Sequence, residues 1–199
     1  MTPALDKEQV GLLLAGSGAL AELVRDRYTQ LFQFSHTQLD NALRIFLEAF
    51  RLPVEAQQID RIIQSFATHY HAQNPSLLAS ADAVHTLTFS LVMLNTDAHS
   101  PQVKNKMTLA QWFSNNRGIN DGRDVPPLLL ERLYYAIKHS EIKMSGSGLT
   151  GHINTERYKD VLHCSRVSWT KRSYIRFQDY LHHCSSSNSN SDSNSNTEI

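Results

Sequence analysis

Apolar residues recur at intervals of three and four along much of the chain, which is the spacing of an α-helix with one buried face. Beyond residue 38 they stand at Leu39, Ala42, Leu43, Phe46, Leu47 and Phe50. Ser35, with Gln38 three residues later, predicts a capping box at the start of this helix. Pro53 then interrupts the pattern, because proline disfavours helical geometry in the residue before it.

The same spacing returns after Glu55 and predicts another helix, with apolar positions at Ile59, Ile62, Ile63, Phe66 and Tyr70. Ser80 and Asp82 open the next helix, which ends before Pro101 and is almost wholly apolar from residue 87 to 94. A helix of that kind is usually central and packed on several sides.

Four shorter helices complete the predicted set. Thr108 and Gln111 form a second capping box, and the proline pair at 126–127 starts a helix that runs to about Ile137. Residues 7–15 and 18–32 are predicted to form two more, ahead of the first long one. No segment alternates with period two between turn signals, so the predicted class is all-α with no sheet.

The composition changes markedly after residue 144. We expect residues 1–144 to form the folded domain and residues 145–184, which begin with a Ser-Gly repeat, to form a linker with a weakly helical extension. Residues 185–199 are dominated by Ser and Asn, which cannot bury a core, so this tail is expected to be disordered.

Charge and cysteine content narrow the choice of partners. Lys plus Arg and Asp plus Glu both number 19, so no basic excess is present to attract nucleic acid or an anionic membrane. The two cysteines are too few for a disulfide scaffold and fit a reducing cytosol. No apolar run approaches the ~20 residues of a membrane span, and residues 1–9 lack the core of a signal peptide.

Two stretches carry candidate chemistry. From Phe50 to Arg61 the sequence FRLPVEAQQIDR places Glu55 directly after a proline-stiffened turn between two amphipathic helices. Alone, Glu55 is an ordinary acid in a first helical turn, where the helix dipole favours it. From Phe89 to Pro101 an apolar helix ends in a polar cluster, and Asn95 and Asp97 there can simply satisfy nearby backbone groups.

In this order and spacing, the two stretches closely resemble the paired signature motifs of the Sec-seven domain family, the catalytic modules of Arf guanine nucleotide exchange factors. The resemblance covers about Val10 to Met144 and continues through residues 106–108 and 115–122. It implies a right-handed helical superhelix or bundle of about eight to ten helices with a hydrophobic groove. The family domain usually starts several helices earlier, so its N-terminal helices are expected to be missing here.

Three residues depart from the family pattern. Val54 stands where the family turn normally has glycine, and valine is a poor occupant if that position needs a positive φ. Ala98 and Ser100 replace the usual Leu and Asn, which trims the polar lip of the groove. The departures leave open a rival function, an Arf-binding module with weak or no exchange activity.

The resemblance implies a mechanism of displacement without covalent chemistry, so the protein is expected to be a regulator of an Arf-family GTPase in its GDP-bound and nucleotide-free forms. In the family, an acidic residue enters the site of magnesium and the β-phosphate, and here that acid is Glu55. The implied groove and lip residues are Ile59, Ile62, Ile63, Asp82, Phe89, Met93, Leu94, Asn95 and Ser100. Most of the apolar ones also serve the core, and the sequence leaves open which helix edges are exposed.

A pocket for the inhibitor brefeldin A is also implied by the family, beside the second motif. Its positions correspond here to Phe89, Ser90, Asp97 and Met107. The last three match the sensitive pattern, whereas sensitive members usually have tyrosine where Phe89 stands, so intermediate inhibition is expected.

Other chemistry finds little support. The histidines at 69, 71, 85 and 99 are not paired with a Ser or Cys nucleophile, so a hydrolytic enzyme is the weaker alternative. His163-Cys164 and His182-His183-Cys184 match no standard zinc spacing, so neither a metal nor a cofactor is expected. The expected location is cytoplasmic, peripherally associated with Golgi or endosomal membranes through the GTPase or through missing domains and regulating vesicle transport.

Overall fold

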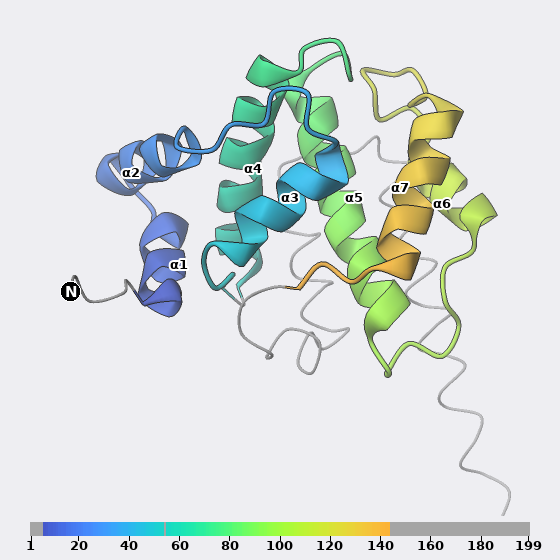
Figure 1. Cartoon of the computed structure of the whole chain (residues 1–199), viewed down its shortest axis with the longest axis horizontal. Helices are drawn as coiled ribbons and strands as arrows, with labels where there is room; N and C mark the ends of the chain where they lie inside the picture. Colours follow the sequence, from blue (N-terminus) through green and yellow to red (C-terminus); the bar gives the residue numbers. More distant parts are fainter. Residues whose placement is uncertain (1–5, 54, 144–199) are drawn as a thin grey trace, which may run out of the picture.

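The computed structural model describes residues 6–53 and 55–143, which contain seven helices and no strand (Figure 1). The helices are α1 (Lys7–Ala15), α2 (Ala19–Thr29), α3 (Leu39–Glu48), α4 (Ala56–Gln73), α5 (Ala81–His99), α6 (Leu109–Asn115) and α7 (Pro127–His139). Within these residues the β-type pairing is limited to an isolated bridge between Asn120 and Arg123. The all-α class predicted from the sequence is confirmed. The expectations for Val54, residues 145–184 and residues 185–199 concern positions outside the described ranges.

Helix α5 is the centre of the fold, as its apolar interior predicts. It passes between α4 and α7, with α3 lying across it and α4 (Figure 1). Every residue from Ala83 to Asn95 is buried. A ring cluster fills the space beside α3 and α4, with Phe46 and Phe66 at a centroid distance of 5.1 Å and Phe34 between the helices. Apolar surface removed from water by these contacts is the main stabilising contribution of the core.

Helix starts follow the capping signals in most places. The Ser80 side chain accepts a hydrogen bond from the Ala83 N–H, and Thr108 with Gln111 forms the predicted capping box. The capping box predicted for Ser35 and Gln38 is wrong. His36 has a φ of 60°, so the chain is still turning there and Gln38 becomes the N-cap of α3.

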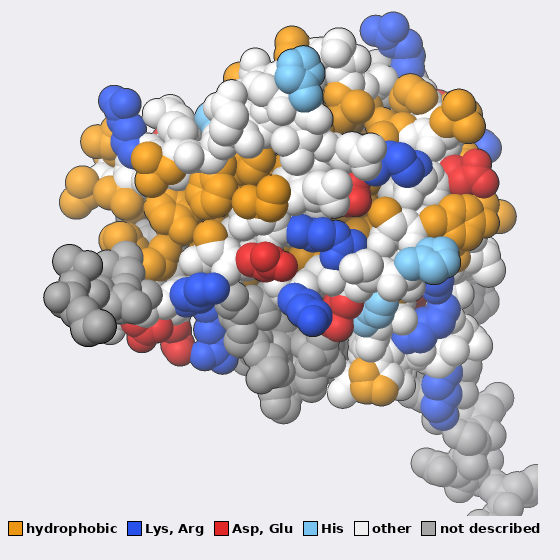
Figure 2. Space-filling model, in the orientation of Figure 1, with side chains coloured by type: hydrophobic (Ala, Val, Ile, Leu, Met, Phe, Trp, Pro, Cys, Tyr) orange, Lys and Arg blue, Asp and Glu red, His pale blue; other side chains and the backbone are white. Residues whose placement is uncertain are grey.

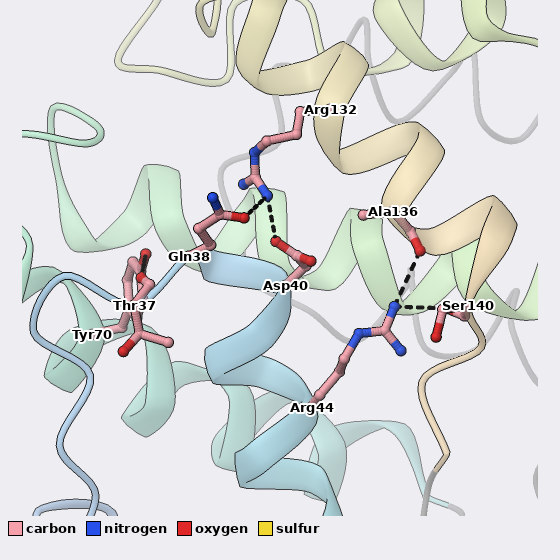
Figure 3. Close-up of polar contacts among 8 residues, drawn as sticks. All are labelled: Thr37, Gln38, Asp40, Arg44, Tyr70, Arg132, Ala136 and Ser140. Atoms are coloured by element: carbon pink, nitrogen blue, oxygen red, sulfur yellow. Dashed lines mark hydrogen bonds and ion pairs between the residues drawn. The ribbon is translucent and has the colours of Figure 1, made fainter.

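Two arginines attach α3 to α7 (Figure 3). The Arg132 guanidinium donates to Asp40, at 2.8 Å, and to the Gln38 side chain. From α3, Arg44 donates to the backbone carbonyls of residues 136, 140 and 141, at 3.2, 2.6 and 2.6 Å. The Ala136 carbonyl also accepts from the Ser140 N–H, and the other two carbonyls follow the end of α7, where a cation is stabilising.

Helices α1 and α2 present an apolar outer surface. Figure 2 shows hydrophobic side chains gathered on the left of this face, where Figure 1 places α1 and α2. The large exposed side chains of the two helices are Leu12, Leu13, Leu20 and Leu23. The opposite edge of α1, with Val10, Gly11 and Leu14, is buried. In the part of the chain described, no helix is long and apolar enough to cross a membrane.

Candidate functional site

The turn between α3 and α4 is anchored to the rest of the fold before it reaches Glu55. Leu52 and Pro53 are buried, Leu52 with 2% of its surface exposed. The Arg51 N–H donates a hydrogen bond of 2.9 Å to the Lys7 carbonyl of α1. Because both the apolar side chains and the backbone of the turn have fixed partners, the start of α4 is held in one place.

Glu55 occupies the N-cap position of α4, but its side chain does not cap the helix. Its backbone is extended, with φ −82° and ψ 133°, and its carbonyl accepts from the N–H groups of Gln58 and Ile59 at 3.1 and 3.0 Å. Its side chain makes no capping hydrogen bond, whereas Ser80 and Thr108 at the same position of other helices do. Glutamate is not among the favoured N-cap residues.

The Glu55 carboxylate is exposed to solvent. Among residues 6–53 and 55–143 no side chain or backbone group forms a hydrogen bond or ion pair with it. An acid that breaks a local preference without an internal partner is typical of a functional position. The geometry leaves this carboxylate available to a group from another molecule.

A hollow of about 280 Å³ opens beside Glu55. Its apolar lining comes from Leu12, Leu52 and Pro53, and its polar lining from Glu8, Arg51, Glu55 and Gln58. Glu8 and Arg51 form an ion pair of 2.7 Å, with 57% and 44% of the two side chains exposed. Such an exposed pair contributes little to stability, so its relevance lies in shaping the hollow.

The six apolar groove candidates lie at the interface of α4 and α5, and the structure divides them into two groups. Ile62, Ile63 and Leu94 have no exposed surface, so they hold the two helices together. Ile59, Phe89 and Met93 are also buried but keep 8%, 5% and 7% of their surface exposed, so they are the three candidates that reach the surface at all.

The polar candidates are spread along α5. Asp82 is exposed in the first turn, at the opposite end of the helix from the other two. Asn95 is buried, and its side-chain oxygen accepts from the Ile142 N–H at 2.8 Å. Ser100 follows the helix as its C-cap and accepts from the Gln102 N–H at 3.3 Å. Asn95 therefore binds a nearby backbone group, as the sequence suggested for a polar residue near the end of this helix.

The four brefeldin-pocket candidates are all buried, and two of them are in direct contact. The Met107 N–H donates to the Asp97 carboxylate at 2.8 Å, whereas Phe89 and Ser90 lie two turns earlier on α5. Lys106 donates to the carbonyls of Asp97 and Ser100, at 2.7 and 2.6 Å. Burial lowers the pKa of Lys106, against the opposing effect of the Asp97 charge.

One buried polar contact was missed by the sequence analysis. His85 of α5 is fully buried, and its Nε2 lies 3.1 Å from the Asp60 carboxylate of α4. The contact does not have hydrogen-bond geometry, and neither ring nitrogen has a hydrogen-bond partner among the described residues. The sequence showed a histidine on an apolar helix, and only the packing of α4 on α5 brings a carboxylate to it.

Gly11 also escaped notice, although an isolated glycine inside a helical pattern usually has a packing reason. A Cβ atom added to Gly11 would lie 1.8 Å from the Arg51 carbonyl oxygen, in the turn that leads to Glu55.

Within the described ranges, no group of three His, Cys, Asp or Glu residues could hold a metal ion. The His-Cys pairs near residues 163 and 183 lie outside those ranges.

Comparison with known families decides the relationship that the motifs suggested. The sequence model of the Sec7 (Sec-seven) domain matches residues 1–142. The chain belongs to the Sec7 domain family. The match extends from α1 to the residues that follow α7, so it includes Glu55 and the whole of α5.

Individual relatives agree with this assignment. The chain is 40% identical over 168 residues to the ARF guanine-nucleotide exchange factor GNOM of Arabidopsis thaliana. This alignment covers 83% of this chain and 12% of that protein. It is 46% identical over 142 residues to the human brefeldin A-inhibited guanine nucleotide-exchange protein 1, covering 70% of this chain and 8% of that protein. This Sec7 chain thus spans about a tenth of the length of these curated relatives.

Solved Sec7 domains share the fold. The Sec7p catalytic domain superposes with a TM-score of 0.66 at 41% identity, covering 70% of this chain and 74% of that one. A structure of ARF1-GDP bound to a Sec7 domain complexed with brefeldin A gives a TM-score of 0.65 at 41% identity, covering 70% of each chain.

Proposed function

We propose that this Sec7 chain binds an Arf-family small GTPase and accelerates the release of GDP, with Glu55 as the residue that displaces the nucleotide. The relatives are named as ARF exchange factors, and a similar Sec7 domain has been solved with ARF1-GDP. The observation that carries the proposal is the exposed Glu55 carboxylate, placed at the start of α4 and engaged by no described residue.

The size of the electrostatic effect is sufficient for exchange. A carboxylate about 4 Å from a phosphate oxygen costs on the order of 4 kcal/mol per unit charge at an effective dielectric constant near 20. Because about 1.4 kcal/mol changes a rate tenfold, one well-placed acid corresponds to roughly a thousandfold faster release. Loss of magnesium contacts adds to this effect. No bond is made or broken by the exchange factor.

The edge between α4 and α5 supplies the binding energy that must hold the emptied GTPase. Ile59, Phe89 and Met93 are largely buried but are the apolar candidates that reach the surface, and Asp82 is an exposed acid on the same helix pair. Nucleotide and exchange factor then weaken each other reciprocally, as linkage requires of two ligands that share one protein. In the cell this activity is proposed to regulate vesicle transport from the cytoplasmic face of Golgi or endosomal membranes, through the bound GTPase.

Release of a fluorescent GDP analogue from purified ARF1 tests the proposal. The 199-residue chain is expected to accelerate release, and Glu55→Lys to abolish the acceleration while retaining binding, because a cation near the phosphates stabilises bound nucleotide. Glu131→Lys is the matched control, since Glu131 is an exposed glutamate on α7, which lies on the other side of α5 from α4 (Figure 1).

Two outcomes would contradict the proposal in different ways. Near wild-type release by Glu55→Lys, with Glu131→Lys also unchanged, would remove Glu55 from the mechanism. Binding of ARF1 by the wild-type chain without faster release would instead favour the Arf-binding module.

A further inference from the structure

Helix α1 is joined to the end of α3 and to the turn before Glu55 by three polar contacts. The Arg51 N–H donates to the Lys7 carbonyl at 2.9 Å, and the Lys7 ammonium donates to the Glu48 carbonyl at 2.6 Å. The Arg51 guanidinium and the Glu8 carboxylate form the third contact, at 2.7 Å. One of the three is between backbone groups, so it depends on how closely the two backbones approach.

Gly11 permits that close approach. A Cβ atom at this position would lie 1.8 Å from the Arg51 carbonyl oxygen and 3.0 Å from its carbonyl carbon. Both are backbone atoms, so rotation of a side chain cannot relieve the overlap, and either α1 or the turn has to shift. Glycine is a poor helix former in the middle of a helix, and its occurrence in α1 is explained by this contact.

The other end of α1 is attached to α4, which begins at the site, and to α2. Arg61 of α4 donates twice to the Ala15 carbonyl, from Nε at 3.1 Å and from Nη2 at 3.0 Å. Arg25 of α2 donates to the Leu14 carbonyl at 2.8 Å. Helix α1 is therefore held at its C-terminus by Arg61 of α4 and in its N-terminal half by Arg51 of the turn. It thus contacts the chain on both sides of Glu55.

We infer that Gly11 is a positioning residue for Glu55. By letting α1 contact the Arg51 backbone, it sets the turn so that the Glu55 carboxylate points at the nucleotide of a bound GTPase. The inference rests on the proposed exchange function. It predicts that a single methyl group at position 11 displaces the acid without touching the surface that binds the GTPase.

The test compares Gly11→Ala with wild type in the full 199-residue chain, using ARF1 loaded with a fluorescent GDP analogue. GDP release is expected to slow by about tenfold or more, since a displacement of about 1 Å at a reacting group can cost up to roughly a hundredfold. Affinity for nucleotide-free ARF1 should stay within about twofold, a split that simple loss of structure would not produce. Gln9→Ala is the control, because Gln9 is an exposed residue of the same helix.

A double-mutant cycle with Glu55→Gln asks whether Gly11 acts through the acid. Protein concentrations are chosen so that release by Glu55→Gln remains measurable above the spontaneous rate. In that background Gly11→Ala is expected to cause little further loss. Full loss on top of Glu55→Gln, or wild-type release by Gly11→Ala alone, would overturn the inference and leave the exchange function intact.

Two further measurements cover the case in which Gly11→Ala folds poorly or the wild-type chain is inactive. The double variant Lys7→Ala, Glu8→Ala removes two of the contacts without adding a clash, and should slow release by a smaller factor than Gly11→Ala. Amide hydrogen exchange at Arg51 is independent of any GTPase, and it should accelerate in both variants while α5 stays protected. If the Arg51 amide exchanges at the wild-type rate in both variants, the proposed contact between α1 and the Arg51 backbone is refuted.

Discussion

Alkaline pH should weaken the fold through Tyr70. This side chain of α4 is 1% exposed, and its hydroxyl donates a hydrogen bond of 2.8 Å to the Thr37 carbonyl in the loop before α3; both residues are drawn in Figure 3. Burial raises the pKa of Tyr70 from 10.0 to about 12. The perturbation is therefore twofold, a rise in pH and the substitution Tyr70→Phe, which removes the titrating group.

The sign follows from which state loses the proton first. Above pH 10 the unfolded chain releases the phenolic proton, whereas the folded protein retains it up to about pH 12. The stability contributed by this group is complete below pH 10 and is lost as pH rises towards 12. Two pKa units correspond to roughly 2 to 3 kcal/mol in total, of which about 1.4 kcal/mol is lost by about pH 11.

Urea unfolding of wild type and Tyr70→Phe at about pH 8 and about pH 11 measures the effect. Near pH 8 the variant should be less stable by about 0.5 to 1.5 kcal/mol, the net value of one hydrogen bond. Near pH 11 the difference should vanish or reverse. Burial also raises the pKa of Tyr28 and of Tyr134, and these groups affect both proteins equally. A stability difference that is the same at both pH values would refute the argument.

Two other predictions concern α7 and the brefeldin pocket. Arg44→Met should lower the unfolding free energy by about 2 to 3 kcal/mol, because three carbonyls at the end of α7 lose their charged donor; urea unfolding near neutral pH checks this, and an unchanged midpoint would count against it. Brefeldin A is expected to inhibit GDP release with intermediate potency, and Phe89→Tyr should lower the inhibitory concentration roughly three- to tenfold by adding one hydrogen bond. Dose curves with the same GTPase measure the shift, and identical curves would mean that position 89 does not contact the inhibitor.

Helix positions and the family relationship could be predicted from the sequence, because their signals are local. The spacing of apolar residues in α3 and α4 indicates which face each helix buries, and the almost wholly apolar run in α5 indicates a helix that is buried on several sides. The capping box of Thr108 and Gln111 lies within four residues and formed as predicted. The box of Ser35 and Gln38 did not form, since His36 is left-handed and Gln38, whose side chain accepts from Arg132, is the N-cap of α3.

The arrangement around Glu55 was decided by tertiary structure. Its position after a proline turn is visible in the sequence, but the hollow beside it requires Glu8 and Leu12, more than forty residues earlier in the chain. The same holds for Gly11 against Arg51 and for His85 against Asp60. Local patterns indicate which face of a helix is buried. They do not indicate which backbone or side chain of a distant segment lies against that face. That depends on how the helices pack, because packing brings residues together by shape and not by their order in the chain.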